Sequence, residues 1–233
     1  MINYMGGIAV PMQLNEESGY NADIDNLRSL ITPRTKLIII NSPNNPCGSV
    51  IPESDLEKIA EMAVENDLVV LADEIYKDMY YGDQEHVSIT KFPGMRERTV
   101  ILDGFSKSYA MTGWRLGYGV FPDFLVEPVT RLMTNSVSCT SVFSQMAAIA
   151  ALEGPQDSVA AMMEEFTKRR DLVVEGLNSL PGITCPVPKG AFYAFPNIRA
   201  TGMSSQEFAN KALYDAGVAL LAGTAFGAFG DGY

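Results

Sequence analysis

The chain has 233 residues, of which 47% are hydrophobic and 19% are charged, a composition typical of a folded protein with a substantial core. Its formal net charge of -11 argues against a nucleic-acid partner, because phosphate backbones are normally bound by clustered Lys and Arg. No apolar run reaches the roughly 18 residues of a membrane-spanning helix, and no secretory signal is visible. Three widely spaced cysteines favour a reducing compartment, so we expect a cytoplasmic protein.

Short apolar runs alternate with helical patterns from residue 35 onward, and this alternation is typical of a parallel sheet covered by helices. In the helix expected from Pro52, apolar residues recur at i, i+3, i+4 and i+7 between Leu56 and Ala63. The expected strands, in chain order, cover residues 37–40, 68–72, 99–102 and 116–121.

The last third of the chain has a different pattern. Residues 144–153 are expected to be helical, and Asp157 is expected to cap a longer helix at which two domains join. Strands are expected over residues 183–185 and 191–195, followed by a helix over residues 204–216 that Gly217 ends. We therefore predict an α/β large domain over residues 1–155, with a mostly parallel sheet in a three-layer α/β/α arrangement, and a partial α+β small domain over residues 156–233.

Three polar segments each follow directly on an expected strand: NSPNNPCG at residues 41–48, DEIY at 73–76, and DGFSK at 103–107, which runs on to GWRLG at 113–117. In open α/β sheets, ligands bind beyond the carboxyl ends of the strands, so the three segments should converge on one site. Each segment alone has a structural explanation, because Asn, Pro and Gly form turns and most lysines are surface charges. Three such segments at one sheet edge favour a functional site.

In order and spacing, SPNNPCG, DEIY and GFSKSYAMTGWRLGY closely resemble the signature set of class I and II aminotransferases of fold type I, particularly bacterial aspartate aminotransferases. The resemblance covers nearly the whole chain. It implies an enzyme that uses pyridoxal 5'-phosphate to transfer an amino group between an amino acid and a 2-oxo acid, with glutamate and 2-oxoglutarate as the expected pair.

Other functions stay open at this point. A C–S lyase or a decarboxylating enzyme of the same fold uses the same residues. An inactive fragment or a non-catalytic effector-binding module is an alternative from a different class. The substrate also stays open, because no arginine lies at residues 133–143, where some aspartate enzymes place the clamp for the substrate's side-chain carboxylate.

The resemblance implies three catalytic residues. Lys107 would form a Schiff base with the cofactor and would then shuttle the substrate's proton. Asp73 would pair with the pyridine nitrogen and keep it protonated, so that the ring acts as an electron sink. Tyr76 would bond the phenolic oxygen of the cofactor.

The remaining cofactor contacts are also implied by the resemblance. Asn45 would bond the phenolic oxygen beside Tyr76, and Arg115 would hold the phosphate, helped by Ser106. Many members of the family have a serine at the position of Gly104, so one hydroxyl contact to the phosphate is expected to be missing. We predict that five of these residues surround one cavity at the carboxyl edge of the sheet, and that the bond before Pro46 is cis: Asn45, Asp73, Tyr76, Lys107 and Arg115.

Histidine and cysteine chemistry is not expected at the site. The single histidine, His86, lies in a polar stretch and is interpreted as a solvated loop residue. Cys47 stands where threonine is commoner in the family and is interpreted as a small buried filler rather than a reactive thiol. The three cysteines form no CxxC pair and have no histidine nearby, so no metal site is expected.

Members of the family are considerably longer than this chain. The part expected before residue 1 supplies a phosphate-binding loop and an aromatic ring that stacks on the cofactor, and the arginine for the substrate α-carboxylate is expected just beyond Tyr233. The chain is therefore expected to be truncated at both ends and to bind pyridoxal phosphate weakly or not at all by itself. Relatives build each site from two subunits, so we expect a homodimer with residues 135–145 near the partner.

Overall fold

The computed structural model describes residues 2–82 and 85–233. The chain divides into two compact units. The first unit contains Met1–Ser42, Ile51–Ile75 and His86–Leu152, and the second contains Pro43–Val50, Tyr76–Glu85 and Glu153–Tyr233. None of the helices in the described residues is both long enough and apolar enough to cross a membrane. The division into domains after residue 155 stays a prediction.

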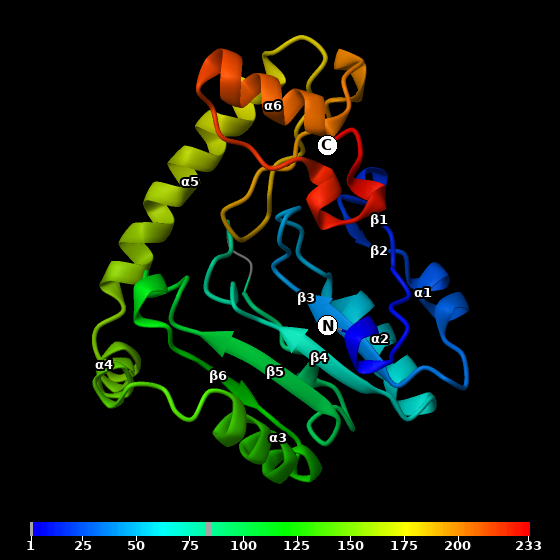
Figure 1. Cartoon of the computed structure of the whole chain (residues 1–233), viewed down its shortest axis with the longest axis vertical. Coiled ribbons are helices and arrows are strands. Elements are labelled where there is room, and N and C mark those ends of the chain that lie inside the picture. The colour runs from blue at the N-terminus through cyan, green and yellow to red at the C-terminus, as the bar shows by residue number, and fades with distance from the viewer. Residues whose placement is uncertain (1, 83–84) are drawn as a thin grey trace. The chain divides into compact units, whose positions relative to one another are not determined.

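The first unit contains a four-stranded sheet in the order β3-β4-β5-β6, shown in Figure 1. The strands β3 (Leu37–Asn41), β4 (Val69–Asp73) and β5 (Thr99–Gly104) are parallel, which confirms three expected strands and the mostly parallel α/β fold. The fourth expected strand is β6 (Gly117–Val120), and it pairs antiparallel with β5. Its direction follows from its connection, since residues 105–116 form turns and a short 3-10 helix instead of the crossover helix that a parallel pair needs.

The core of this unit lies between the sheet and the helix α2 (Glu53–Glu65). Ile38 and Ile40 of β3 alternate with exposed residues, so their side chains share one face of the sheet with Val70 of β4. Against them pack the apolar residues at helical spacing that the sequence indicated, from Leu56 to Ala63. The expected helix after Pro52 is therefore confirmed.

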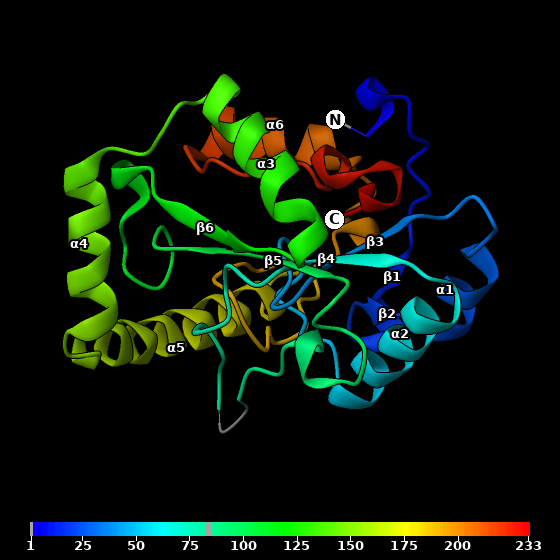
Figure 2. The same cartoon turned by 90° about the horizontal axis from the view of Figure 1, so that it is seen from below.

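Three further helices belong to this unit. The helix α1 (Ile24–Leu30) was not expected; Asp23 caps it by accepting a hydrogen bond from Asn26 N. The helix α3 (Asp123–Ser136) was also not expected and contains Pro128, whereas α4 (Val142–Glu153) confirms the helix expected over residues 144–153. Figure 2 shows α2 and α3 on either side of the sheet. Many apolar side chains of α3 and α4 are exposed, and α3 has no buried residue.

The second unit is built around two helices, α5 (Asp157–Asn178) and α6 (Ser205–Ala216). A capping box of Ser204 and Glu207 begins α6, and Gly217, at φ 70°, ends it, as expected. The expected cap of α5 is wrong, because Asp157 is already the first helical residue and Gln156 is the N-cap without a side-chain bond.

The strands expected over residues 183–185 and 191–195 are also wrong. In their place the structure describes isolated bridges, Thr184 with Asn197 and Tyr80 with Gly190. Ala191 has a left-handed backbone, at φ 57°, which interrupts an extended run. The described chain also contains a two-residue pair, β1 (Leu14–Asn15) with β2 (Asn21–Ala22), and seven 3-10 helices: η1 (Asn3–Met5), η2 (Glu16–Ser18), η3 (Ile89–Lys91), η4 (Thr112–Trp114), η5 (Arg199–Thr201), η6 (Gly223–Phe226) and η7 (Ala228–Gly230).

Candidate active site

Asp73 and Lys107 lie near each other at the carboxyl edge of the sheet in the first unit. Asp73 is the last residue of β4, and Lys107 follows the end of β5 by three residues, where the two strands run parallel. The pKa of the Asp73 carboxyl is raised, mainly by burial and also by the negative charge of Asp103. Two contacts oppose this shift and lower the pKa: the N–H of Ile75, 3.2 Å from Asp73 Oδ1, and the Lys107 ammonium. The structure therefore places an amine beside a carboxylate that is partly withdrawn from water.

The turn that carries Lys107 is anchored by Asp103, a buried carboxylate at the end of β5. Its Oδ1 accepts a hydrogen bond from Gly104 N at 2.6 Å, and its Oδ2 accepts one from Tyr118 Oη at 2.5 Å. Tyr118 is the antiparallel partner of Asp103 in β6, so both side chains lie on one face of the sheet. The ring of Phe105 lies 5.8 Å from that of Tyr118. The sequence analysis missed Asp103 and Tyr118, because their pairing depends on the antiparallel register of β6.

Gly104 has a steric reason to be glycine. It pairs with Gly117 across β5 and β6, and a Cβ added at Gly104 would lie 3.0 Å from Gly117 Cα and 3.2 Å from Leu116 O. A serine at this position therefore fits only if the neighbouring backbone shifts. The close approach of the two strands therefore favours glycine at this position.

Arg115 follows η4 with a left-handed backbone, at φ 52°, and its side chain is exposed. Its Nη1 donates to Thr112 O at 2.9 Å, which holds the guanidinium against the preceding turn. Ser106, beside Lys107, is half-buried. Joint contact of Arg115 and Ser106 with a phosphate stays a prediction.

Asn45 and Tyr76 lie in the second unit, where a third residue, Tyr193, joins them. The hydroxyl oxygens of Tyr76 and Tyr193 are 2.6 Å apart, and Asn45 Nδ2 donates to Tyr193 Oη at 3.3 Å. Tyr76 is 3% exposed. The bond between Asn45 and Pro46 is cis, as expected. Tyr193 was missed because it lies 148 residues from Asn45 in a stretch, GAFYAF, without a recognisable polar pattern.

A cavity of about 190 Å³ lies within the second unit beside Tyr193. Its walls are mostly apolar and aromatic, with two arginines from α5. The lining residues are Tyr81, Phe166, Arg169, Arg170, Val173, Val174, Pro188, Phe192, Tyr193 and Ala194. The predicted convergence of Asn45 and Tyr76 with Asp73, Lys107 and Arg115 on one cavity stays a prediction.

His86 is a half-buried loop residue that contacts the buried carboxylate of Glu74, so its interpretation as a solvated residue is wrong. Its Nε2 lies 2.8 Å from Oε2 of Glu74, and Ser88 Oγ donates to Glu74 Oε1 at 2.7 Å. Glu74 is 6% exposed, and its carboxylate needs such partners because an unpaired buried charge is costly. Glu74 and His86 thus join the two ends of the segment that carries Tyr76. The segment that carries Asn45 is closed in the same way, since Ile51 N donates to Ser42 Oγ at 3.1 Å.

We expect His86→Ala to lower the free energy of unfolding by about 1–3 kcal/mol. The reason is that the buried Glu74 carboxylate loses its hydrogen bond with the imidazole. Urea unfolding measures this change. A double-mutant cycle with Glu74→Gln should give a clear coupling energy. The exposed neighbour variant Glu85→Ala is the control and should change stability by no more than about 0.5 kcal/mol. Equal stabilities of His86→Ala and Glu85→Ala would contradict the role of the cluster.

Two other features do not contribute chemistry. Burial raises the pKa of the Cys47 thiol to about 12, which makes it a poor nucleophile at neutral pH and agrees with its interpretation as a filler.

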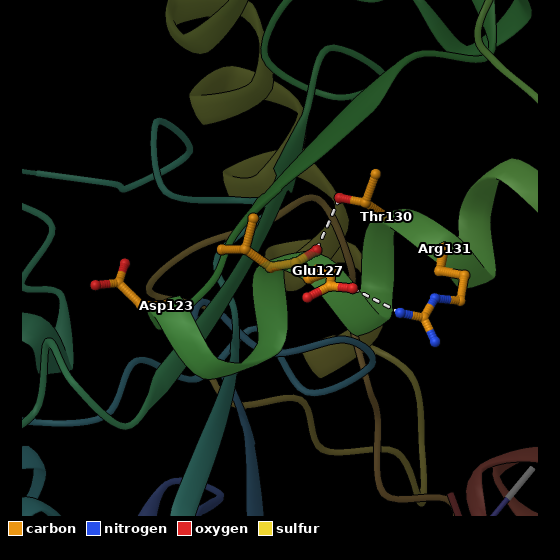
Figure 3. A pocket seen from close by; sticks show the side chains of 5 residues that line it. Asp123, Glu127, Thr130 and Arg131 are labelled. Carbon is orange, nitrogen blue, oxygen red and sulfur yellow. Dashed lines mark hydrogen bonds and ion pairs between the residues drawn. The ribbon is translucent and has the colours of Figure 1, made fainter.

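Figure 3 shows a shallow hollow beside α3, where Asp123, Glu127, Thr130 and Arg131 follow one another along a single helix. Its polar groups are engaged locally, with Arg131 2.6 Å from Glu127, and it contains none of the expected site residues. Among the described residues, no group of three or more His, Cys, Asp or Glu side chains is arranged to hold a metal ion.

Comparison with known proteins decides the family. The family described as "Aminotransferase class I and II" matches residues 1–232. The chain belongs to this family. It is 44% identical to the aspartate aminotransferase of Pyrococcus abyssi over 230 residues, which are 98% of this chain and 59% of that protein. It is 43% identical to aromatic-amino-acid aminotransferase 2 of Thermococcus litoralis over 230 residues, again 98% and 59% of the two chains.

The solved structure of the aromatic aminotransferase from Pyrococcus horikoshii matches this chain with a TM-score of 0.96 and 41% identity, covering 100% of this chain and 62% of that one. The chain thus spans about 60% of the length of its relatives. Class I and II aminotransferases depend on pyridoxal phosphate. The residues of the first unit fit this cofactor, because a partly buried carboxylate and an amine lie together at the sheet edge, suited to a pyridine nitrogen and a carbonyl.

Proposed function

We propose that the chain is the cofactor-binding core of a pyridoxal-phosphate-dependent aminotransferase that moves an amino group between an amino acid and a 2-oxo acid. The observation that carries the proposal is that Asp73 and Lys107 lie near each other at the carboxyl ends of parallel strands, where α/β enzymes bind their ligands. Family membership supports the same reaction class. The chain spans about 60% of the length of these relatives, so the activity is proposed for the whole protein.

When bound, pyridoxal phosphate supplies an electron sink for the bonds around the substrate's α-carbon. Lys107 is proposed to bind the cofactor covalently and afterwards to take the proton from the α-carbon and return it. Asp73 holds the pyridine nitrogen in its protonated form with a charge-assisted hydrogen bond. Asn45 and Tyr76 donate to the phenolic oxygen, and Arg115 with Ser106 binds the phosphate.

The substrate pair that we propose is glutamate with 2-oxoglutarate. The named relatives act on different amino acids, aspartate in one case and aromatic amino acids in another. The identity of the amino-group donor is therefore the part of the proposal that goes beyond family membership. No arginine at residues 133–143 is available to bind the side-chain carboxylate of glutamate, so this contact is proposed to come from another segment.

The test is absorbance spectroscopy of the full-length protein with pyridoxal phosphate. We expect a visible band that depends on Lys107, and its loss on addition of glutamate with recovery on addition of 2-oxoglutarate. A band that forms but does not respond to any amino acid would indicate a sensor, and release of ammonia and a thiol from a cysteine-type substrate would indicate a C–S lyase. Either outcome, or the absence of a band, would contradict the proposal.

We also propose that the protein is a cytoplasmic homodimer with residues 135–145 near the partner. Exposed apolar side chains gather in and beside this segment, including Leu132, Met133, Val142 and Phe143, and such surface normally contacts another chain. The three cysteines, none of which forms a disulfide, support a reducing compartment. Light scattering that gives a monomer at high concentration would contradict the dimer, and recovery from a membrane or secreted fraction would contradict the compartment.

A further inference from the structure

The hydroxyl of Tyr193 connects two side chains that the proposed function assigns to the cofactor. Asn45 Nδ2 donates to Tyr193 Oη at 3.3 Å, and Tyr193 Oη lies 2.6 Å from Tyr76 Oη. A phenolic hydroxyl carries one proton and accepts through its lone pairs. Tyr193 Oη accepts from the asparagine and keeps its own proton, and in the tyrosine pair either hydroxyl can be the donor. In the arrangement in which Tyr193 donates, the proton of Tyr76 is left for a different acceptor.

Ring packing fixes the side chains of Tyr76 and Tyr193 relative to each other. The ring of Tyr76 is 3% exposed and meets the rings of Phe192 and Tyr193 edge-on, with centroids 5.6 and 5.7 Å away. Edge-to-face packing of this kind defines the direction in which each hydroxyl points. Tyr76 and Tyr193 therefore keep one relative orientation instead of exchanging among several.

The backbone of the Tyr193 segment is also held against the loop that carries Asn45. Lys189 N and Gly190 N both donate to Gly48 O, at 2.8 and 3.0 Å. A Cβ at Gly48 would lie 2.6 Å from Pro188 Cβ and 3.3 Å from Tyr193 O, so the two segments are in direct contact. The position of the Tyr193 hydroxyl is thus fixed by the same turn that presents Asn45.

We infer that Tyr193 is a positioning residue of the active site: its hydroxyl donates to Tyr76 and so directs the proton of Tyr76 toward the phenolic oxygen of the cofactor. A hydroxyl that accepts a hydrogen bond is also a stronger donor. This inference rests on the proposed function, because it takes the assignment of Asn45 and Tyr76 to the phenolic oxygen as given. Tyr193 acts through Tyr76 and is not itself proposed to contact the substrate.

The test uses the visible absorption band of the full-length holoenzyme, followed as a function of pH, with Tyr193→Phe, Tyr76→Phe and the double variant. A donor to the phenolic oxygen favours its anionic form, so losing the donor should raise the midpoint of the titration. We expect Tyr76→Phe to raise it and Tyr193→Phe to raise it by a smaller amount, up to about one pH unit. The double variant should show no shift beyond that of Tyr76→Phe.

Tyr81→Phe is the matched control, because Tyr81 is another buried tyrosine of the second unit and donates to Ala191 O at 2.7 Å. Its midpoint should equal that of the unsubstituted protein. If Tyr193→Phe does not fold, as judged by circular dichroism, incorporation of 3-fluorotyrosine at position 193 keeps the ring and gives a more acidic donor, so the midpoint should fall.

The outcomes separate the inference from the proposed function. No visible band in the unsubstituted holoenzyme would contradict the proposed function itself. The positioning role would be overturned if the midpoint moves in Tyr76→Phe but stays unchanged in Tyr193→Phe. If Tyr193→Phe does not fold, an unchanged midpoint in the fluorotyrosine protein would overturn it instead. Additive shifts in the double variant would also overturn it, because Tyr193 would then act without Tyr76.

Discussion

Lys107→Ala in the full-length protein is expected to abolish transamination and to leave the fold intact. The change removes both the covalent attachment of the cofactor and the base that is positioned for the α-carbon proton. General acid–base help alone is typically worth about 10²–10⁴ in rate, so the half-reaction with an amino acid should slow by at least this factor. Lys107 is half-buried and follows the strand instead of packing in the core, so its loss should not unfold the protein.

Single-turnover absorbance measurements with an amino acid give the half-reaction rate, and circular dichroism gives the state of the fold. The matched control is Lys36→Ala, an exposed lysine just before β3, at the opposite end of the parallel strands from Lys107. It should react like the unsubstituted protein. Near-normal half-reaction rates in Lys107→Ala would show that the catalytic lysine has been assigned wrongly.

Asp73→Asn is expected to change activity and stability in opposite directions. The half-reaction should slow severely, because an amide cannot hold the proton on the pyridine nitrogen and the electron sink is weakened. The cofactor-free protein should become more stable at pH 7, since burial raises the pKa of Asp73 and the ionised carboxylate is therefore unfavourable in the folded state. The amide oxygen can still accept the hydrogen bond from Ile75 N.

The stability difference should depend on pH in a defined direction. When the folded-state pKa of a carboxyl is raised, the folded protein binds more protons than the unfolded chain between the ordinary and the raised pKa. The unsubstituted protein should therefore lose stability as the pH rises through that window, and Asp73→Asn should lose less. Urea unfolding at several pH values measures the difference, with the exposed Asp215→Asn of α6 as the control. A lower stability of Asp73→Asn at pH 7 would contradict the account.

The parts of the fold that could be predicted are those in which local pattern and packing agree. Ile38 and Ile40 alternate with exposed residues, and the apolar residues of α2 recur at helical spacing, so both elements were correctly placed. The helix α3 was missed because Pro128 lies inside it and none of its residues is buried in the chain. Residues 183–185 and 191–195 are apolar enough for strands, but a strand also needs a partner, and isolated bridges are all that the described chain supplies there.

The same distinction holds for the site. The nearness of Lys107 and Asp73 could be predicted because each stands in a recognisable motif at or just after the end of a parallel strand. Tyr193 and the Asp103–Tyr118 pair could not, because their contacts join segments far apart in the chain or depend on strand direction. The polar environment of His86 was missed for a similar reason, since Glu74 binds it from the end of another segment.

The hydrogen bonds at Ser42 and Glu74 allow the segments that carry Asn45 and Tyr76 to vary in length. Each segment leaves a strand of the sheet and returns to a residue that is tied to the strand's own end, Ile51 in one case and His86 in the other. The entropic cost of such a closed loop grows only with the logarithm of its length, by about 0.6 kcal/mol for each doubling. Insertions between the tied ends therefore leave the strand ends, and with them Asp73, in place. The length of these two loops can therefore change while the sheet keeps Asp73 at the same position.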